Sequence, residues 1–415
     1  MIKKIVVSIC LLFSLVSVAQ EATSSPYSFY GIGDVKFKGT IENRSMGGLG
    51  ILSDSIHINL QNPASYASLK RTTMAIAGTN NATTLKSNTG KETANRTSLD
   101  YLAVAFPMGK FGAAFGLLPY SSVGYKIESI SSTGGDNKRY TGEGGMNKVF
   151  VGLGYQVTSK LSIGLDINYN FGKIETRNIV FKPQVQYGSR ELNTSDLSGA
   201  SFNFGAMYKT KLNEKLDIYG SLSYMPGSTL TSKNTSNIAT ISYNSNGAEI
   251  VNASKDRTVA NTDLKIPSKV AFGAGIGAAR KWFVGTEITL EQTSKMGNRF
   301  DDMTQGTYED SKKVAFGGYY IPNYASYTSY LSRVTYRGGF KFENTGLVIN
   351  NQGINDMGMS LGVGLPVGSN FSNINIGLEY GKRGTTSANL IQENYFNLSI
   401  GLSLSDLWFR KSKFD

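Results

Sequence analysis

Few residues in this sequence could support chemistry. His57 is the only histidine among 415 residues, and Cys10 is the only cysteine. A Ser-His-Asp hydrolase would need His57 to face a serine and a carboxylate. A zinc site would need several His or Cys ligands. A lone histidine is more often a hydrogen-bonded structural side chain, so we expect no enzyme activity and no cofactor.

Two further patterns suggest binding sites at first sight. Asp301-Asp302 lies near Glu309-Asp310, but these carboxylates lack the ordered Asp/Asn/Gly spacing of a calcium loop. Gly273-Ala-Gly-Ile-Gly277 resembles a phosphate-binding loop, yet it lies within an expected strand and does not open a helix. We therefore expect no metal site and no nucleotide site.

The composition excludes several protein classes. Aromatic residues make up 11%, charged residues only 17% and the mean hydropathy is −0.19, so disorder is not expected. One cysteine excludes a disulfide scaffold. The net charge is +12, but the basic residues are scattered and form no block of about 5–8, which argues against nucleic acid. Contact with an anionic membrane surface and an ordinary solvated surface both remain open.

The N-terminus has the pattern of a secretory signal. Lys3 and Lys4 precede an uncharged, mostly apolar run that ends at Val18, and Ser17-Val18-Ala19 offers small residues for cleavage. We predict a signal peptide over residues 1–19. Cys10 lies inside it, so the mature chain would contain no thiol.

The dominant pattern beyond the signal is strict alternation. In Leu161–Phe171 every odd position is apolar, and every even position is Ser, Gly, Asp or Asn. Such a segment forms a strand with one apolar face. These segments run roughly 10–13 residues, and a tilted strand needs about 9–11 residues to cross a bilayer.

Short turns alternate with long polar stretches along the chain, as in outer-membrane barrels. The long stretches are 126–145, 176–198, 227–263 and 294–311, and we expect them to be loops. The expected strands are 71–79, 97–107, 110–125, 146–158, 160–175, 199–211, 214–226, 264–279, 281–293, 312–321, 332–344, 355–366, 371–382 and 391–404. The sequence thus predicts an all-β fold, a 14-stranded antiparallel transmembrane β-barrel over residues 71–415.

A soluble secreted sandwich or propeller would also show alternation. A propeller would repeat about every 40–50 residues, and a sandwich of this length would need linkers between domains; neither is visible after residue 70. Aromatic residues near strand ends favour the barrel, because they would form interfacial girdles. They are Tyr120, Tyr155, Tyr224, Trp282, Tyr380, Trp408 and Phe409.

Residues 20–70 do not alternate, and they read as a compact segment with short helices near 44–48 and 63–69. Such a segment could be a periplasmic extension or a plug. A large barrel leaves a lumen to fill, so we predict that residues 20–70 form an N-terminal hatch in the lumen. Its motif residues are Gly47, Gly48, Asn62, Pro63 and Ala64.

These residues carry a resemblance. Gly47-Gly48, then Asp54, then Asn62-Pro63-Ala64 are similar to the hatch of the FadL/TodX-type (OMPP1) outer-membrane transporters of hydrophobic compounds. Ile266-Pro-Ser-Lys-Val-Ala-Phe-Gly273 resembles that family's Pro-started mid-barrel strand. The C-terminal part, from Tyr336-Arg-Gly-Gly-Phe340 to Trp408-Phe-Arg410, resembles its Bacteroidota-type branch.

The resemblance implies a monomeric barrel in the outer membrane of a Gram-negative bacterium, plugged by its hatch. It implies passive diffusion of long-chain fatty acid-like or other small apolar molecules, released sideways at a kinked third strand. In this chain Pro119 and Gly124 of strand 110–125 are the candidate gate, since Pro and Gly mark strand edges and bends. Pro119 at the membrane rim is the open alternative.

The long polar loops leave a second function open, in which the chain is an accessory β-barrel subunit of an outer-membrane secretion or barrel-assembly complex. The expected partners are therefore outer-membrane lipid, a small hydrophobic ligand and other outer-membrane proteins.

Overall fold

The computed structural model describes residues 23–131, 134–297, 306–367 and 372–407. The predicted signal peptide (1–19), the carboxylates Asp301-Asp302, and Trp408, Phe409 and Arg410 lie outside these residues. Among the described residues, no helix combines the length and apolarity needed to cross a bilayer.

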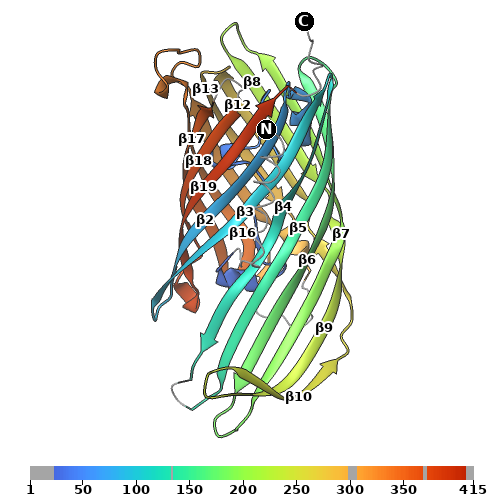
Figure 1. The fold of residues 1–415 in the computed structure, drawn as a ribbon, viewed down its shortest axis with the longest axis vertical. Coiled ribbons are helices and arrows are strands. Elements are labelled where there is room, and N and C mark those ends of the chain that lie inside the picture. Colours follow the sequence, from blue (N-terminus) through green and yellow to red (C-terminus); the bar gives the residue numbers. More distant parts are fainter. Residues whose placement is uncertain (1–22, 132–133, 298–305, 368–371, 408–415) are drawn as a thin grey trace, which may run out of the picture.

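The chain is built almost entirely of strands (Figure 1). In chain order the elements are η1 (Pro26–Phe29), β1 (Asp34–Val35), α2 (Ile41–Arg44), η2 (Pro63–Ser68), β2 (Thr72–Lys86), β3 (Lys91–Met108), β4 (Phe111–Ser129), β5 (Asn137–Gln156), β6 (Leu161–Phe181), β7 (Gly188–Lys211), β8 (Asp217–Met225), β9 (Ser228–Tyr243), β10 (Glu249–Arg257), β11 (Thr262–Ile266), β12 (Lys269–Ala278), β13 (Trp282–Glu291), η3 (Thr293–Lys295), β14 (Gly306–Tyr308), β15 (Ser311–Tyr320), η4 (Leu331–Arg333), β16 (Thr335–Ile349), β17 (Gln352–Val367), β18 (Ser372–Arg383), η5 (Ser387–Asn389) and β19 (Gln392–Asp406).

The strands close into one 14-stranded antiparallel transmembrane barrel. The closure is the pairing of β19 with β2, which runs from Gln392↔Lys86 to Asp406↔Thr72. β8 and β9 are two parts of one interrupted barrel strand, since both pair with β7. β10, β11 and β12 likewise form the next barrel strand, since they pair with β9 and β8. The predicted strand count and fold class are confirmed.

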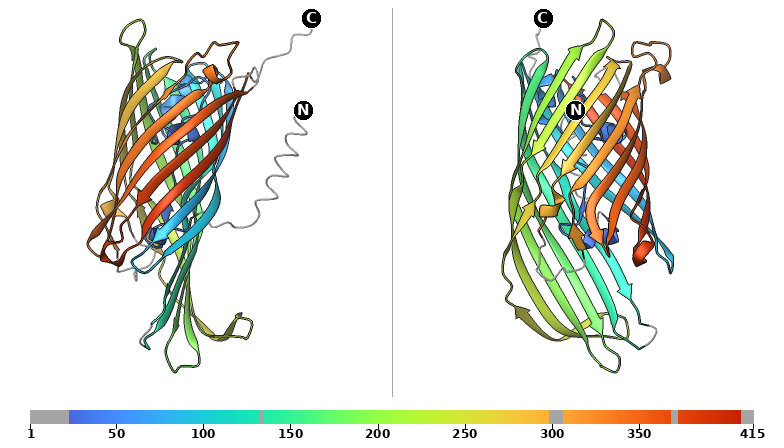
Figure 2. Two further views of the ribbon diagram at one scale, coloured as in Figure 1. Left: turned by 90° about the vertical axis from the view of Figure 1, so that its left-hand side faces the viewer. Right: turned by 180° about the vertical axis from the view of Figure 1, so that it is seen from behind.

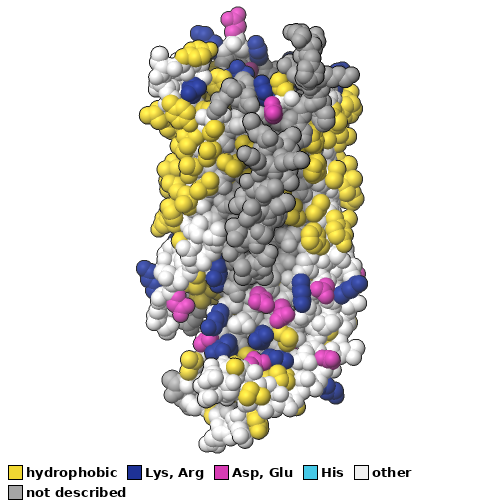
Figure 3. All heavy atoms as spheres, viewed as in Figure 1, with side chains coloured by type: hydrophobic (Ala, Val, Ile, Leu, Met, Phe, Trp, Pro, Cys, Tyr) yellow, Lys and Arg dark blue, Asp and Glu magenta, His cyan; other side chains and the backbone are white. Residues whose placement is uncertain are grey.

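The two faces of the wall differ as the alternation predicts. In β6, Ile163, Ile167 and Tyr169 are exposed on the outer surface, whereas Asp166 and Asn168 are buried. The apolar side chains gather in a belt around one part of the barrel, and the remainder of the visible outer surface is mostly polar (Figure 3). This belt is the surface that meets lipid in a transmembrane barrel.

The prediction of long polar loops is wrong for 126–145, 176–198 and 227–263. These residues instead lengthen β4, β5, β6 and β7 and form β9 and β10. The extended strands form a curved sheet that projects well beyond the rest of the barrel (Figure 2). Beyond the bilayer neither face needs apolar side chains, so the alternation fades although backbone pairing continues. Ser and Thr are frequent there, and Thr favours strands.

Residues 23–70 lie largely inside the barrel. Their three short helical turns contact different parts of the wall: η1 contacts β4, α2 contacts β17, β18 and β19, and η2 contacts β3 to β7. One hydrophobic core cluster consists of thirteen buried apolar residues, and it joins this segment to β2, β3, β4 and β5. The segment therefore packs as part of the folded core.

Candidate functional site

The motif Asn62-Pro63-Ala64 binds the wall directly. The Asn62 side chain caps η2 by accepting from the Ala64 N–H at 3.1 Å, as N-cap residues do. Its Nδ2 donates to the carbonyls of Ala206 (3.2 Å) and Leu222 (3.0 Å) in β7 and β8. The Asn62 side chain therefore caps η2 and also hydrogen-bonds this turn to β7 and β8.

Glycines in the wall make room for this turn. A Cβ added at Gly164 would clash with Pro63 and Ala64, and one at Gly205 would clash with the Asn62 side chain. Other wall glycines in comparable contact with residues 41–67 include Gly112, Gly152, Gly154, Gly273, Gly317, Gly339, Gly362, Gly377 and Gly401. The inward glycines therefore let residues 41–67 approach the wall backbone closely.

Gly47 and Gly48 follow α2 and adopt left-handed conformations, with φ of +73° and +89°, as glycines after a helix often do. The Gly47 N–H donates to the Ser360 hydroxyl at 3.0 Å. A side chain at Gly47 would press on the Phe340 backbone. Both features of the glycine pair, its conformation and its contacts, fit a tight turn against β16 and β17.

Charged groups secure α2. Arg44 reaches Asp100 of β3 at 3.3 Å and donates to Thr79 of β2 at 2.6 Å. Nearby in the wall, Asn375 of β18 donates to Glu42 at 2.8 Å. These contacts tie α2 to one stretch of the wall from β18 to β3, so α2 would break several of them on leaving it.

His57 has a structural environment. Its Nδ1 lies 2.6 Å from an Asp54 carboxylate oxygen, and its Nε2 lies 3.2 Å from the Asn373 amide. Burial lowers the pKa of His57, but the Asp54 carboxylate outweighs this and raises it overall. Burial alone would raise the pKa of Asp54, and His57 brings it down to about 2. Among the described residues, no group of His, Cys, Asp and Glu could hold a metal ion.

The wall is split between β3 and β4. Their pairing runs only from Met108↔Phe111 to Leu102↔Leu117, although both strands continue for many residues. The split starts next to Pro119, where the register of β4 against β5 also shifts. Such a bulge bends a strand. Beyond it, residues 120–125 are all buried, in contrast to the alternating exposure before it.

The N-terminal part of the chain covers this free edge of β4. β1 pairs with it at Asp34↔Ser122 and Val35↔Ser121, and the Lys36 N–H donates to the Tyr120 carbonyl at 3.0 Å. Farther along, the Gly124 N–H donates to Ser28 at 3.2 Å. The structure therefore places Pro119 and Gly124 along one covered opening in the wall, and a gating role for them stays a prediction.

This cover is also fastened to β18 and β19, which lie beyond β2 and β3 in the wall. Asp34 accepts from Arg383 of β18 at 2.6 Å, and Lys36 lies 3.6 Å from the same carboxylate. Ser25 donates to Glu393 of β19, and the Tyr27 hydroxyl donates to the Ile391 carbonyl. Burial would raise the pKa of Asp34, but Arg383 and Lys36 lower it overall.

An apolar cluster lies behind the split. It joins Ile32 of the N-terminal segment to side chains of β4 to β6 and to residues of the neighbouring wall. Its members are Ile32, Tyr120, Val123, Tyr125, Met146, Ile174, Leu197, Met225, Leu230, Leu264 and Ile266, with Phe29, Ile127 and Tyr140 packed against it. Tyr120 is 3% exposed within this cluster, so its predicted place in an interfacial girdle is wrong. Tyr120 continues the inward face of Ala114 and Leu118, which are also buried, so its side chain points into the lumen.

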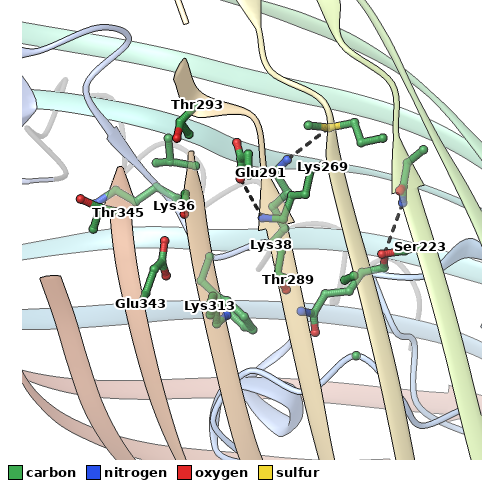
Figure 4. Close-up of a pocket in the computed structure, with 18 of the residues that line it drawn as sticks. Lys36, Lys38, Ser223, Lys269, Thr289, Glu291, Thr293, Lys313, Glu343 and Thr345 are labelled. Carbon is green, nitrogen blue, oxygen red and sulfur yellow. Dashed lines mark hydrogen bonds and ion pairs between the residues drawn. The ribbon is translucent and has the colours of Figure 1, made fainter. Parts of the chain in front are cut away.

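A cavity of about 300 Å³ lies between the N-terminal segment and the wall. Its lining is strongly charged. Lys36 and Lys38 come from the N-terminal segment, and Lys269, Lys313, Glu291 and Glu343 come from β12, β15, β13 and β16 (Figure 4). Lys269 pairs with Glu291 at 3.4 Å. Sequence reasoning missed this site. The sequence pattern that could have indicated this cavity is the presence of charged residues at inward strand positions, where the other residues are mostly Gly, Ser and Asn.

Comparison with solved structures places this fold among known barrels. The toluene transporter TbuX of Ralstonia pickettii matches with a TM-score of 0.60 and 14% identity, covering 89% of this chain and 99% of that one. The toluene transporter TodX of Pseudomonas putida gives 0.58, 14%, 90% and 99%. A FadL homologue of Pseudomonas aeruginosa gives 0.58, 11%, 91% and 99%. At these identities the likeness concerns the fold.

No curated protein sequence matches this chain significantly. A family model does, and it covers the chain from residue 1 to residue 415. Because this match spans the whole chain, it shows the family directly: the chain belongs to the BamG family.

Proposed function

We propose that this protein is an outer-membrane barrel that lets small hydrophobic molecules pass sideways into the membrane through the β3–β4 split. The observation that carries the proposal is the split itself, with its free β4 edge covered by residues 28–36 and an apolar cluster behind it. A molecule that displaced Ile32 from this cluster would find apolar walls on one side and lipid on the other.

The proposed path runs beside the hatch and avoids its centre. The cavity next to residues 33–38 is lined by charged side chains, and an apolar molecule gains nothing from leaving one polar surface for another. The solved barrels named above as toluene transporters share the fold over nearly their whole length, which favours this class of cargo. Residues 23–70 would act as the plug and residues 28–36 as its movable part.

Uptake with and without a restrained cover tests the proposal. Val35→Cys and Ser121→Cys place thiols on register partners of β1 and β4, in a chain whose only natural cysteine lies in the predicted signal peptide. A short, reducible thiol crosslinker should abolish uptake of labelled toluene and fatty acids, and reduction should restore it. Val35→Cys alone is the matched control. Uptake that is equal in crosslinked and reduced cells, or absent for every apolar compound, would refute the proposal.

A second function is favoured by the projecting sheet. There, strands β4 to β7, β9 and β10 extend beyond the rest of the barrel (Figure 2), and β10 pairs only with β9 among the described residues. A free strand edge is a template for an added strand. In this case the protein would be an accessory barrel subunit of an outer-membrane complex whose partner docks on β10.

Site-specific photo-crosslinking separates the two functions. A photoreactive residue at Val251 of β10, which is 47% exposed, should capture one protein of defined mass in intact cells. The same residue at Leu361, on the apolar belt and 65% exposed, is the control and should capture lipid only. A particle of about 43 kDa after gentle extraction, the mass without the signal peptide, combined with no capture at Val251, would exclude the second function.

A further inference from the structure

In the described part of the chain, two cavity lysines that approach the Tyr120 ring have no carboxylate ion-pair partner. Lys38 belongs to the N-terminal segment and Lys148 to β5, and both line the cavity. The Lys38 ammonium lies 3.8 Å from the Met225 sulfur and 4.6 Å from the centroid of the Tyr120 ring, and it also contacts the Lys148 side chain. The Lys148 ammonium lies 4.9 Å from the centroid of the same ring.

The nearby carboxylates are already engaged. Glu291 pairs with Lys269, Glu287 accepts from the Gly50 N–H at 2.9 Å, and Asp166 accepts from Asn203 at 3.2 Å. The described part of the cavity wall therefore offers the two ammonium groups a ring face and a sulfur, but no carboxylate within ion-pair distance.

Such an arrangement is electrostatically incomplete. Lys148 is only 5% exposed, so it is removed from bulk water, and two like charges that approach one ring repel each other. Burial, followed by the proximity of Lys148 and Lys269, lowers the pKa of Lys38. A negatively charged group between them would reverse the sign of this interaction, and the cavity has room for one.

We propose that Lys38 and Lys148 bind a small oxyanion of the phosphate class in the lumen cavity. Lysine ammonium groups bind phosphate as point charges, and the space beside them is continuous with the 300 Å³ cavity. The bound anion joins Lys38 of the N-terminal segment to Lys148 of the wall, so it would tie the cover of the split to β5. The anion is either free phosphate or the phosphate of a lipid headgroup.

Thermal unfolding of the full-length protein in detergent tests the proposal. Inorganic phosphate, added at constant ionic strength against chloride, should raise the unfolding temperature. Lys38→Met and Lys148→Met should each weaken phosphate binding at least tenfold. Each should also unfold at a higher temperature than the wild type in phosphate-free buffer, because an unpaired charge has been removed. Lys173→Met, which alters an exposed lysine that lies 3.9 Å from Glu175, is the matched control and should keep the phosphate response.

A second arm identifies the source of the phosphate and guards against misfolding. A short-chain phosphatidic acid is titrated in parallel, and stabilisation by either compound that is lost in both lysine variants supports the proposal. Lys38→Arg keeps the charge and should keep the response, which shows that the Met variants fail through charge and not through folding. The proposal is overturned if neither compound stabilises the wild type, or if both Met variants respond as the wild type does.

Discussion

The Asp34–Arg383 ion pair is predicted to hold the cover of the β3–β4 split in place. Asp34→Asn keeps the size of the side chain but removes the charge that faces Arg383 at 2.6 Å and Lys36 at 3.6 Å. Both members of the Arg383 pair are largely shielded, with side-chain exposures of 17% and 22%. A hydrogen bond between charged groups contributes about 1.5–3 kcal/mol, so we expect the substitution to favour opening of residues 28–36 by that amount.

Amide hydrogen exchange measures this opening directly. The Lys36 N–H is protected by the Tyr120 carbonyl at 3.0 Å, so it exchanges only when β1 leaves the β4 edge. A cost of about 1.4 kcal/mol corresponds to a tenfold change. Exchange of the Lys36 amide should therefore accelerate by about tenfold to a hundredfold in Asp34→Asn.

The control is Glu128→Gln on the projecting end of β4, which breaks an exposed pair with Arg139 at 2.9 Å. Exposed pairs contribute about 0–1 kcal/mol, and this one lies away from β1. The Lys36 amide should exchange at the wild-type rate in this variant. A Lys36 rate within twofold of wild type in Asp34→Asn would refute the idea that the ion pair fastens the cover.

Two further predictions concern the seating of residues 41–70. Gly164→Ala would press on Pro63 and Ala64, so it should lower the free energy of unfolding by about 1–3 kcal/mol in a urea titration. Gly220→Ala, whose new Cβ would find its nearest neighbour at 3.9 Å, should leave it unchanged. The raised pKa of His57 means that its pair with Asp54 stabilises the fold fully below the unfolded pKa of about 6.5 and that this stability is lost as the pH rises through the folded pKa. Local exchange near His57 should accelerate over that range in the wild type, and His57→Gln should abolish the pH dependence.

The transmembrane part of the fold was predictable because lipid imposes a rule on every second residue. Val149, Val151 and Leu153 of β5 face outward, and Lys148 and Phe150 face inward, so alternation alone defines the strand. The inward glycines were predictable for the same reason. Their purpose became clear only with residues 41–67 in place, since a sequence does not say which glycine meets Ala64 or Asn62.

Features set by contacts distant in sequence could not be predicted. The projecting strands carry polar residues on both faces, so their pattern resembles that of loops. Beyond the bulge beside Pro119, where the register of β4 against β5 shifts, Ser121–Tyr125 are buried at every position, because the N-terminal segment covers this edge. Asp34 and Arg383 are separated by 349 positions, and the sequence gives no reason to pair them.

The central claim is that residues 23–70 plug a barrel whose lumen would otherwise be open. Ion conductance in a planar bilayer tests it most directly, by comparing the intact mature protein with a refolded variant that lacks residues 20–70. We predict little or no conductance for the intact protein and a large, stable conductance for the variant, since a barrel of this size has an open lumen once it is empty. A large steady conductance of the intact protein, equal to that of the variant, would contradict the account.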